Sequence, residues 1–60
     1  MTALMHRVVA VSNLCTVTTF VIAHDDDEAE IMGLQQIAAE FGISDTSMFF
    51  DIETECEEAQ

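Results

Sequence analysis

The sequence predicts an α+β domain in which one helix packs on one face of a three-stranded antiparallel sheet, with the element order ββαβ. Three observations support this fold class: two N-terminal runs rich in β-branched residues, a central amphipathic segment, and an alternating segment near the C-terminus. Sixty residues suffice for a single small acidic domain, 1–60, with one thin core. Because 50% of the residues are hydrophobic, we expect the chain to fold despite its charge.

The first two strands are expected at Met5–Val11 and Cys15–Ala23, where Val, Thr and Ile favour extended backbone. The segment Ser12-Asn13-Leu14 between them is expected to form a turn. Ser and Asn bond readily to nearby backbone groups, and Asn tolerates left-handed geometry. The two strands therefore form an antiparallel hairpin.

A helix is expected at Asp26–Phe41, because apolar residues recur there at three- and four-residue spacing. The apolar face consists of Ile31, Leu34, Ile37, Ala38 and Phe41. Acidic residues at its start interact favourably with the positive end of the helix dipole. The pair Asp27 and Glu30 resembles a capping box. Gly42 is expected to end the helix. Gly33 inside it costs about 1 kcal/mol relative to Ala.

After a polar connector at Ser44–Ser47, the alternation of residues predicts a third strand at Met48–Cys56. One side would present Met48, Phe50, Ile52, Thr54 and Cys56, and the other Phe49, Asp51, Glu53 and Glu55. The tail Glu57–Gln60 is expected to fray. The helix returns the chain so that the third strand pairs beside the first, in the order 2-1-3. The face away from the helix would stay open to solvent, a second copy or a target.

Negative charge is the strongest feature of the composition. Twelve Asp and Glu oppose one Arg, Arg7, and the formal net charge is −11. Solubility of a small domain needs a net charge of only about 2 to 8, so this excess favours association with a basic partner. All the acids follow His24, and the candidate partner-binding residues form two patches. The first patch is Asp25, Asp26, Asp27, Glu28 and Glu30, and the second is Asp51, Glu53, Glu55 and Glu57.

The second patch is expected to form a negative row on one strand face, because alternate strand residues lie about 6.8 Å apart. This spacing is of the same order as the separation of successive phosphates along one nucleic-acid strand, where the axial rise is about 3.4 Å per phosphate. The alternative is a solvated strand face whose acids prevent edge pairing.

For the first patch, the alternatives are helix capping or a loose Mg²⁺ or Ca²⁺ site. An EF-hand does not fit, because a loop from Asp25 would place Glu30 and Gln36 where Gly and Glu belong.

Several classes of function are not expected. A domain this small has little room for a catalytic cleft, so we expect no enzyme, no catalytic residues and no cofactor. Among the metal-binding residue types, His6, His24, Cys15 and Cys56 lack the spacing of a zinc site, so no metal is expected. The two cysteines are expected to be reduced thiols, in a cytoplasmic setting.

Direct binding to DNA, RNA or an anionic membrane is not expected, because one Arg cannot offset a charge of −11. Polar residues interrupt the apolar run that ends at Ala23. Neither a signal peptide nor a membrane-spanning helix is therefore expected.

In its length, its lack of Lys and its patches DDDEAE at 25–30 and DIETECEE at 51–58, the chain resembles small phage-encoded nucleic-acid mimics. These inhibitors include type I anti-CRISPR proteins and anti-restriction proteins. The resemblance concerns the character of more than half the chain, and no residue is carried over by position. It implies an inhibitor, active in the cytoplasm of a bacterial host, that occupies the basic DNA- or RNA-binding surface of a defence complex.

Arg7 and the neutral hairpin depart from a uniformly acidic mimic, and they indicate a scaffold or a self-association surface. The alternative function is therefore a small homodimeric assembly or regulatory protein whose acids serve solubility. Adaptation of an ordinary domain to high salt also remains open at this point.

Overall fold

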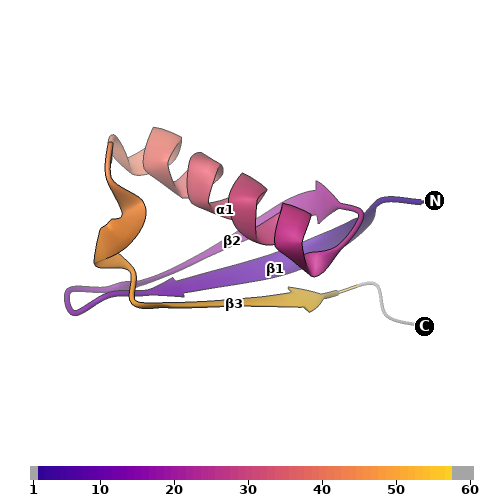
Figure 1. Cartoon of the computed structure of the whole chain (residues 1–60), viewed down its shortest axis with the longest axis horizontal. Coiled ribbons are helices and arrows are strands. Elements are labelled where there is room, and N and C mark those ends of the chain that lie inside the picture. Colours follow the sequence, from indigo (N-terminus) through magenta and orange to yellow (C-terminus); the bar gives the residue numbers. More distant parts are fainter. Residues whose placement is uncertain (1, 58–60) are drawn as a thin grey trace.

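The computed structural model describes residues 2–57 and confirms the predicted α+β architecture (Figure 1). Strands β1 (Leu4–Val11) and β2 (Thr16–Ala23) form an antiparallel hairpin, and helix α1 (Asp26–Phe41) then crosses back over the sheet. A short 3₁₀ helix, η1 (Thr46–Met48), leads into β3 (Asp51–Cys56). β3 pairs antiparallel with β1, so the strand order is β2-β1-β3, as predicted. α1 covers one face of the sheet, and the opposite face, here called the open face, has no covering element within residues 2–57.

The hairpin turn is held by Ser12. Its backbone N–H donates to the carbonyl of Cys15 at 2.9 Å, and its hydroxyl oxygen accepts from the N–H groups of Leu14 and Cys15. The predicted role of Ser in the turn is thus confirmed, but Asn13 does not adopt left-handed backbone. Cys15 lies in the turn instead of in the strand, because its backbone closes the loop with Ser12.

The core lies between α1 and the sheet. Its buried apolar residues are Val8, Ala10, Val21, Ala23, Ala29, Ile37 and Phe49. The predicted ends of α1 are confirmed, and Gly42 ends the helix with a left-handed φ of 67° while its N–H donates to the carbonyl of Ala38. Gly tolerates this conformation because it lacks a Cβ atom.

The predicted apolar face of α1 is wrong in part. Ile31 and Phe41 are 60% and 56% exposed, whereas the buried positions of the helix are Ala29, Gly33 and Ile37. These three residues follow one another at four-residue spacing and two of them are small, so the helix backbone comes close to β1 at Val8. The close approach of the α1 backbone to β1, and not the position of the largest side chains, determines which face of α1 is buried.

The third strand begins three residues later than predicted. η1 takes up Met48, and its N-cap Asp45 accepts a hydrogen bond from the N–H of Ser47 at 2.9 Å. The alternation therefore does not extend back to 48, and the predicted sides of two aromatic residues are reversed: Phe49 is 6% exposed and Phe50 is 67% exposed. From Asp51 to Cys56 the predicted alternation is confirmed.

Of the tail predicted to fray, residues 58–60 lie outside the described residues. Glu57 is held to the sheet, because its N–H donates to the carbonyl of Met5 at 2.9 Å. In the part of the chain from 2 to 57, no helix has the length and apolar character needed to cross a membrane.

Candidate partner-binding acidic surface

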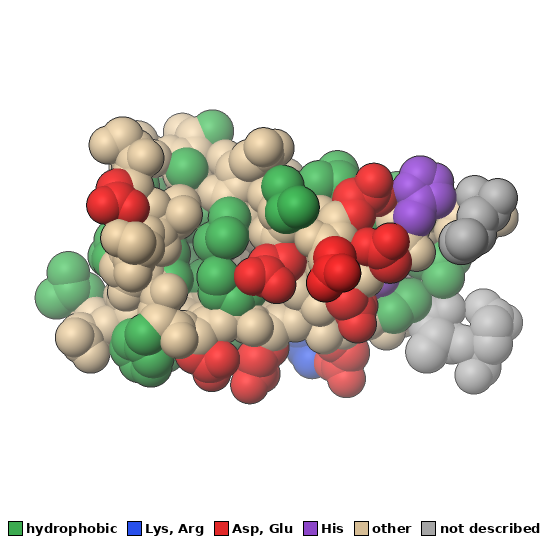
Figure 2. All heavy atoms as spheres, viewed as in Figure 1, with side chains coloured by type: hydrophobic (Ala, Val, Ile, Leu, Met, Phe, Trp, Pro, Cys, Tyr) green, Lys and Arg blue, Asp and Glu red, His purple; other side chains and the backbone are tan. Residues whose placement is uncertain are grey.

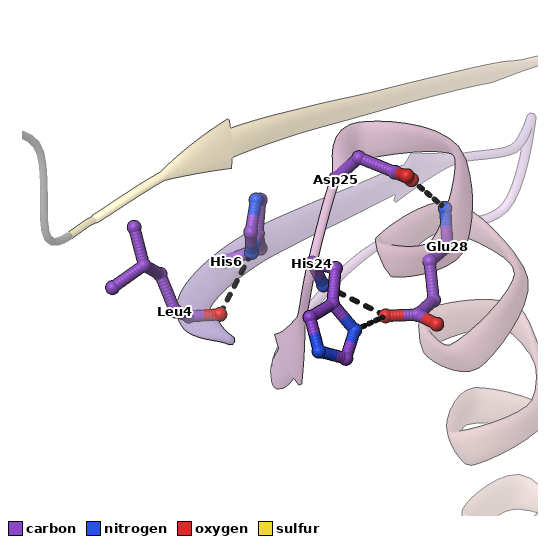
Figure 3. Close-up of polar contacts among 5 residues, drawn as sticks. All are labelled: Leu4, His6, His24, Asp25 and Glu28. Carbon is purple, nitrogen blue, oxygen red and sulfur yellow. Dashed lines mark hydrogen bonds and ion pairs between the residues drawn. The ribbon is translucent and has the colours of Figure 1, made fainter. Parts of the chain in front are cut away.

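The first acidic patch surrounds the N-terminus of α1 (Figure 3). Asp25 is the N-cap: its Oδ1 accepts from the N–H of Glu28 at 2.8 Å. The Glu28 carboxylate in turn accepts from the backbone N–H of His24 at 2.7 Å and contacts His24 Nδ1 at 3.0 Å. The predicted capping pair, Asp27 with Glu30, is therefore wrong. The cap forms two residues earlier because β2 ends at Ala23 and the chain must turn immediately into the helix.

These bonds change the electrostatics of Glu28. The hydrogen bond from the backbone N–H of His24, followed by the bond from the His24 ring, lowers the pKa of the Glu28 carboxyl below its ordinary value of 4.5. Asp25 and Glu28 thus have structural roles at the helix start. The alternative of ordinary capping chemistry is confirmed for these two acids.

Asp26 links the helix start to the sheet. Its Oδ1 lies 3.7 Å from Nε2 of His6, a residue of β1 that is 4% exposed. The other ring nitrogen of His6, Nδ1, lies 2.9 Å from the Leu4 carbonyl oxygen, which can only accept, so Nδ1 donates this bond (Figure 3). His6 is also the cross-strand partner of Cys56, the last residue of β3. The first turn of α1 therefore lies over the end of the sheet at which β3 finishes.

The second patch follows β3 on the open face. Asp51, Glu53 and Glu55 are exposed and alternate with partly buried residues, as predicted. Glu57, beyond the strand end, continues the same ladder through its bond to Met5. Four acids of the second patch thus lie in one row along the edge of the sheet.

The row is not uniformly negative, because Arg7 of β1 lies beside it. Arg7 is the cross-strand partner of Glu55, and its guanidinium group hydrogen-bonds to the Glu55 carboxylate. Arg7 Nε also lies 3.7 Å from a carboxylate oxygen of Glu57. Arg7, the one basic residue of the otherwise neutral hairpin, therefore lies among the acids of the second patch. The missed signal is in the sequence: the order 2-1-3 with period-two alternation places Arg7 on the same face as the acids.

An open hollow of about 510 Å³ lies at this row, lined by Arg7, Val9, Glu53, Thr54 and Glu55. Its lining combines one guanidinium group with two carboxylates and the apolar side chain of Val9. Directly across the ladder, Asp51 and Glu53 face Val11 and Val9, and the ion pairs of Arg7 are with Glu55 and Glu57 instead.

The first patch lies at the start of α1 and the second on the open face along β3, and both are visible from one side of the molecule (Figure 2); together they are called the acidic surface. Figure 2 shows acidic side chains gathered around the start of α1 and along β3. Among the acids of the two patches, those for which residues 2–57 offer no hydrogen-bond or ion-pair partner are Asp27, Glu30, Asp51 and Glu53. The remaining predicted site residues, Asp25, Asp26, Glu28, Glu55 and Glu57, each have a contact described above. Four exposed carboxylates of the two patches therefore remain available to a cationic partner.

The residues considered for a metal site are spread over the structure. His6 and Cys56 are cross-strand neighbours, while Cys15 lies in the hairpin turn at the other end of β1, and both cysteines are free. Among the described residues, no three His, Cys, Asp or Glu side chains converge to hold a metal ion. His24 is engaged with Glu28.

Comparisons with models of protein families, with curated proteins and with solved structures found no match to this chain. The geometry of the acidic surface is therefore the basis for a functional assignment. The charge layout and the contacts of the individual carboxylates carry that assignment.

Proposed function

We propose that this chain inhibits a nucleic-acid-binding protein by occupying its basic surface, in the manner of a nucleic-acid mimic. The observation that carries the proposal is the layout of carboxylates: Asp27 and Glu30 on α1, and Asp51 and Glu53 on β3, are exposed and have no cationic partner within residues 2–57. Lys and Arg side chains that bind phosphates would find comparable charges here. A bacterial defence complex that binds DNA or RNA is the proposed target.

The contacts refine which acids act. Glu55 and Glu57 are partly neutralised by Arg7, and Asp25 and Glu28 are engaged in capping the helix. A partner that bound these acids would first have to displace existing contacts. The four unpaired carboxylates of the two patches are therefore expected to contribute most to association with the target.

The experiment begins with a pull-down. The full chain is immobilised on a resin and incubated with a nuclease-treated bacterial lysate at about 0.05 M and at about 0.5 M salt. The proteins that bind at each salt concentration are identified by mass spectrometry. Each bound protein is then tested with labelled duplex DNA and with RNA for competition. We expect a bound protein that releases nucleic acid as the chain is added, and that loses the chain at the higher salt.

Two matched double variants locate the binding surface. D51N/E53Q removes two unpaired carboxylates from β3, and E40Q/D45N removes two exposed carboxylates elsewhere, with Asn retained as a competent cap at 45. We expect the first variant to weaken competition at least about 10-fold and the second to weaken it much less. Equal effects of the two variants would show that total charge, and not the acidic surface, governs binding. Binding that persists at high salt would contradict the mimic mechanism.

A further inference from the structure

The outer edge of β2 is chemically unlike the rest of this acidic chain. The ladder between β1 and β2 includes the hydrogen-bonded pair Ser12 and Cys15, and bonding alternates along it. The backbone N–H and C=O groups that point away from β1 are therefore those of Thr16, Thr18, Phe20 and Ile22. Within residues 2–57, the partner found for these outward groups is the side chain of Gln36, which donates to the Phe20 carbonyl at 3.3 Å.

The side chains along this edge are uncharged throughout Thr16–Ala23. Phe20 and Ile22 are 50% and 56% exposed on the open face, and Met32 of α1 is 37% exposed on the other side of the edge. These three residues line a hollow of about 740 Å³ that runs beside the strand. Free edges of sheets usually carry charges, Pro or a bulge that prevents pairing, and the β3 edge, flanked by its acidic row, follows that rule. The β2 edge does not.

We propose that β2 pairs antiparallel with β2 of a second copy of this chain, about a twofold axis. The product is one six-stranded sheet with the order β3-β1-β2-β2-β1-β3. This proposal stands independently of the proposed inhibitory function. It also differs from association through the open face, because backbone hydrogen bonds along the edge join the copies.

The distribution of charge favours this second copy as the occupant. Like-charged chains repel, but in this arrangement the two acidic rows lie five strand spacings apart, or about 24 Å. That distance exceeds the Debye length of about 8 Å at physiological ionic strength, so the rows interact weakly. Pairing through the β3 edge would instead bring the two acidic rows together. Of the two edges of the sheet, β2 is thus the one that keeps the acidic rows of the two copies apart.

The available area fits a dimer that depends on concentration. An eight-residue strand is about 27 Å long, and the two shorter dimensions of the chain are 17 and 15 Å, which gives about 400–460 Å² per copy. Both copies together bury about 800–900 Å², the size of a weak and reversible interface. Burial of Phe20, Ile22 and Met32 at this edge adds apolar surface that a 60-residue domain otherwise leaves in water.

The test is sedimentation equilibrium of the full chain in a reducing buffer, because Cys15 is exposed and free. We expect the mass to rise with concentration from 6.6 kDa to twice that value. In parallel, amide hydrogen exchange is measured at low and high concentration. The N–H groups of Thr16, Thr18, Phe20 and Ile22 should gain protection as the dimer forms, since they face solvent in the single chain.

A matched pair of variants localises the contact. Thr18→Lys places a charge at the exposed edge of β2 and should weaken dimerisation at least about 10-fold, because the two copies bring these charges near the twofold axis. Ser44→Lys adds the same charge at an exposed loop position and should leave dimerisation unchanged. A chain that stays monomeric up to about 1 mM overturns the proposal. A dimer in which the β2 amides remain unprotected from exchange also overturns the proposal. The same holds if the β2 amides gain protection only when a different protein is added.

Discussion

Gly33 allows α1 to approach the sheet, and its replacement by Ala tests how tightly the helix packs. A Cβ atom at Gly33 would lie 2.7 Å from Cγ1 of Val8 and 2.9 Å from both Cβ and Cγ2 of Val8. Val8 is fully buried in the central strand, and its β-branched side chain has little rotamer freedom to move aside. Either α1 must lift away from β1 or Val8 must leave its position.

The expected magnitude combines two opposing terms. Forcing an extra methyl group into a packed core costs about 1–3 kcal/mol. Ala in place of Gly inside a helix contributes about 1 kcal/mol in the other direction. We therefore expect G33A to lower the free energy of unfolding by about 1 kcal/mol, within about 0–2 kcal/mol. For a 60-residue chain with a total of about 3–9 kcal/mol, this change is readily measured.

Urea unfolding followed by far-UV circular dichroism is the appropriate assay, because the chain has neither Trp nor Tyr for fluorescence. The matched control is Ala39→Gly, at an exposed position of the same helix, which measures helix propensity alone. If G33A raised the free energy of unfolding by the amount that A39G lowers it, the close contact with Val8 would be refuted.

Two further predictions concern the helix start. Asp25→Ala removes the N-cap acceptor for the N–H of Glu28 and should lower the free energy of unfolding by about 1 kcal/mol. Asp25→Asn keeps a side-chain oxygen at this position and should therefore retain most of the stability. Equal losses of stability in the two variants would contradict the assignment of Asp25 as the cap. For Glu28, the folded-state pKa lies below its ordinary value of 4.5, so its contribution to stability is present above pH 4.5 and is lost as the pH falls through the folded-state pKa. The difference in free energy of unfolding between the wild type and Glu28→Gln, measured by urea unfolding in a pH series, should therefore shrink as the pH falls below 4.5. A difference that stayed constant into acid would show that the bond from His24 does not depend on the carboxylate charge.

The candidate site was predictable as a set of residues but not as a set of contacts. Alternation along β3 placed Asp51, Glu53 and Glu55 on one face, because side-chain direction in a strand depends only on position along the chain. Which acids remain unpaired depends on neighbours that are distant in sequence. Arg7 meets Glu55 across 48 positions of the chain, and only the register of β1 against β3 brings them together.

The sequence by itself determined the element order, the ends of α1, the strand order and the concentration of charge after His24. Those features follow from local propensity, periodicity and connectivity, all of which can be read along the chain. The tertiary structure alone decided which face of α1 is buried, because the contact of Gly33 with Val8 favours close backbone approach over burial of Ile31 and Phe41. It also decided that Phe49 enters the core instead of Phe50. How side chains from distant segments pack against one another is a property of the folded chain, and no local pattern encodes it.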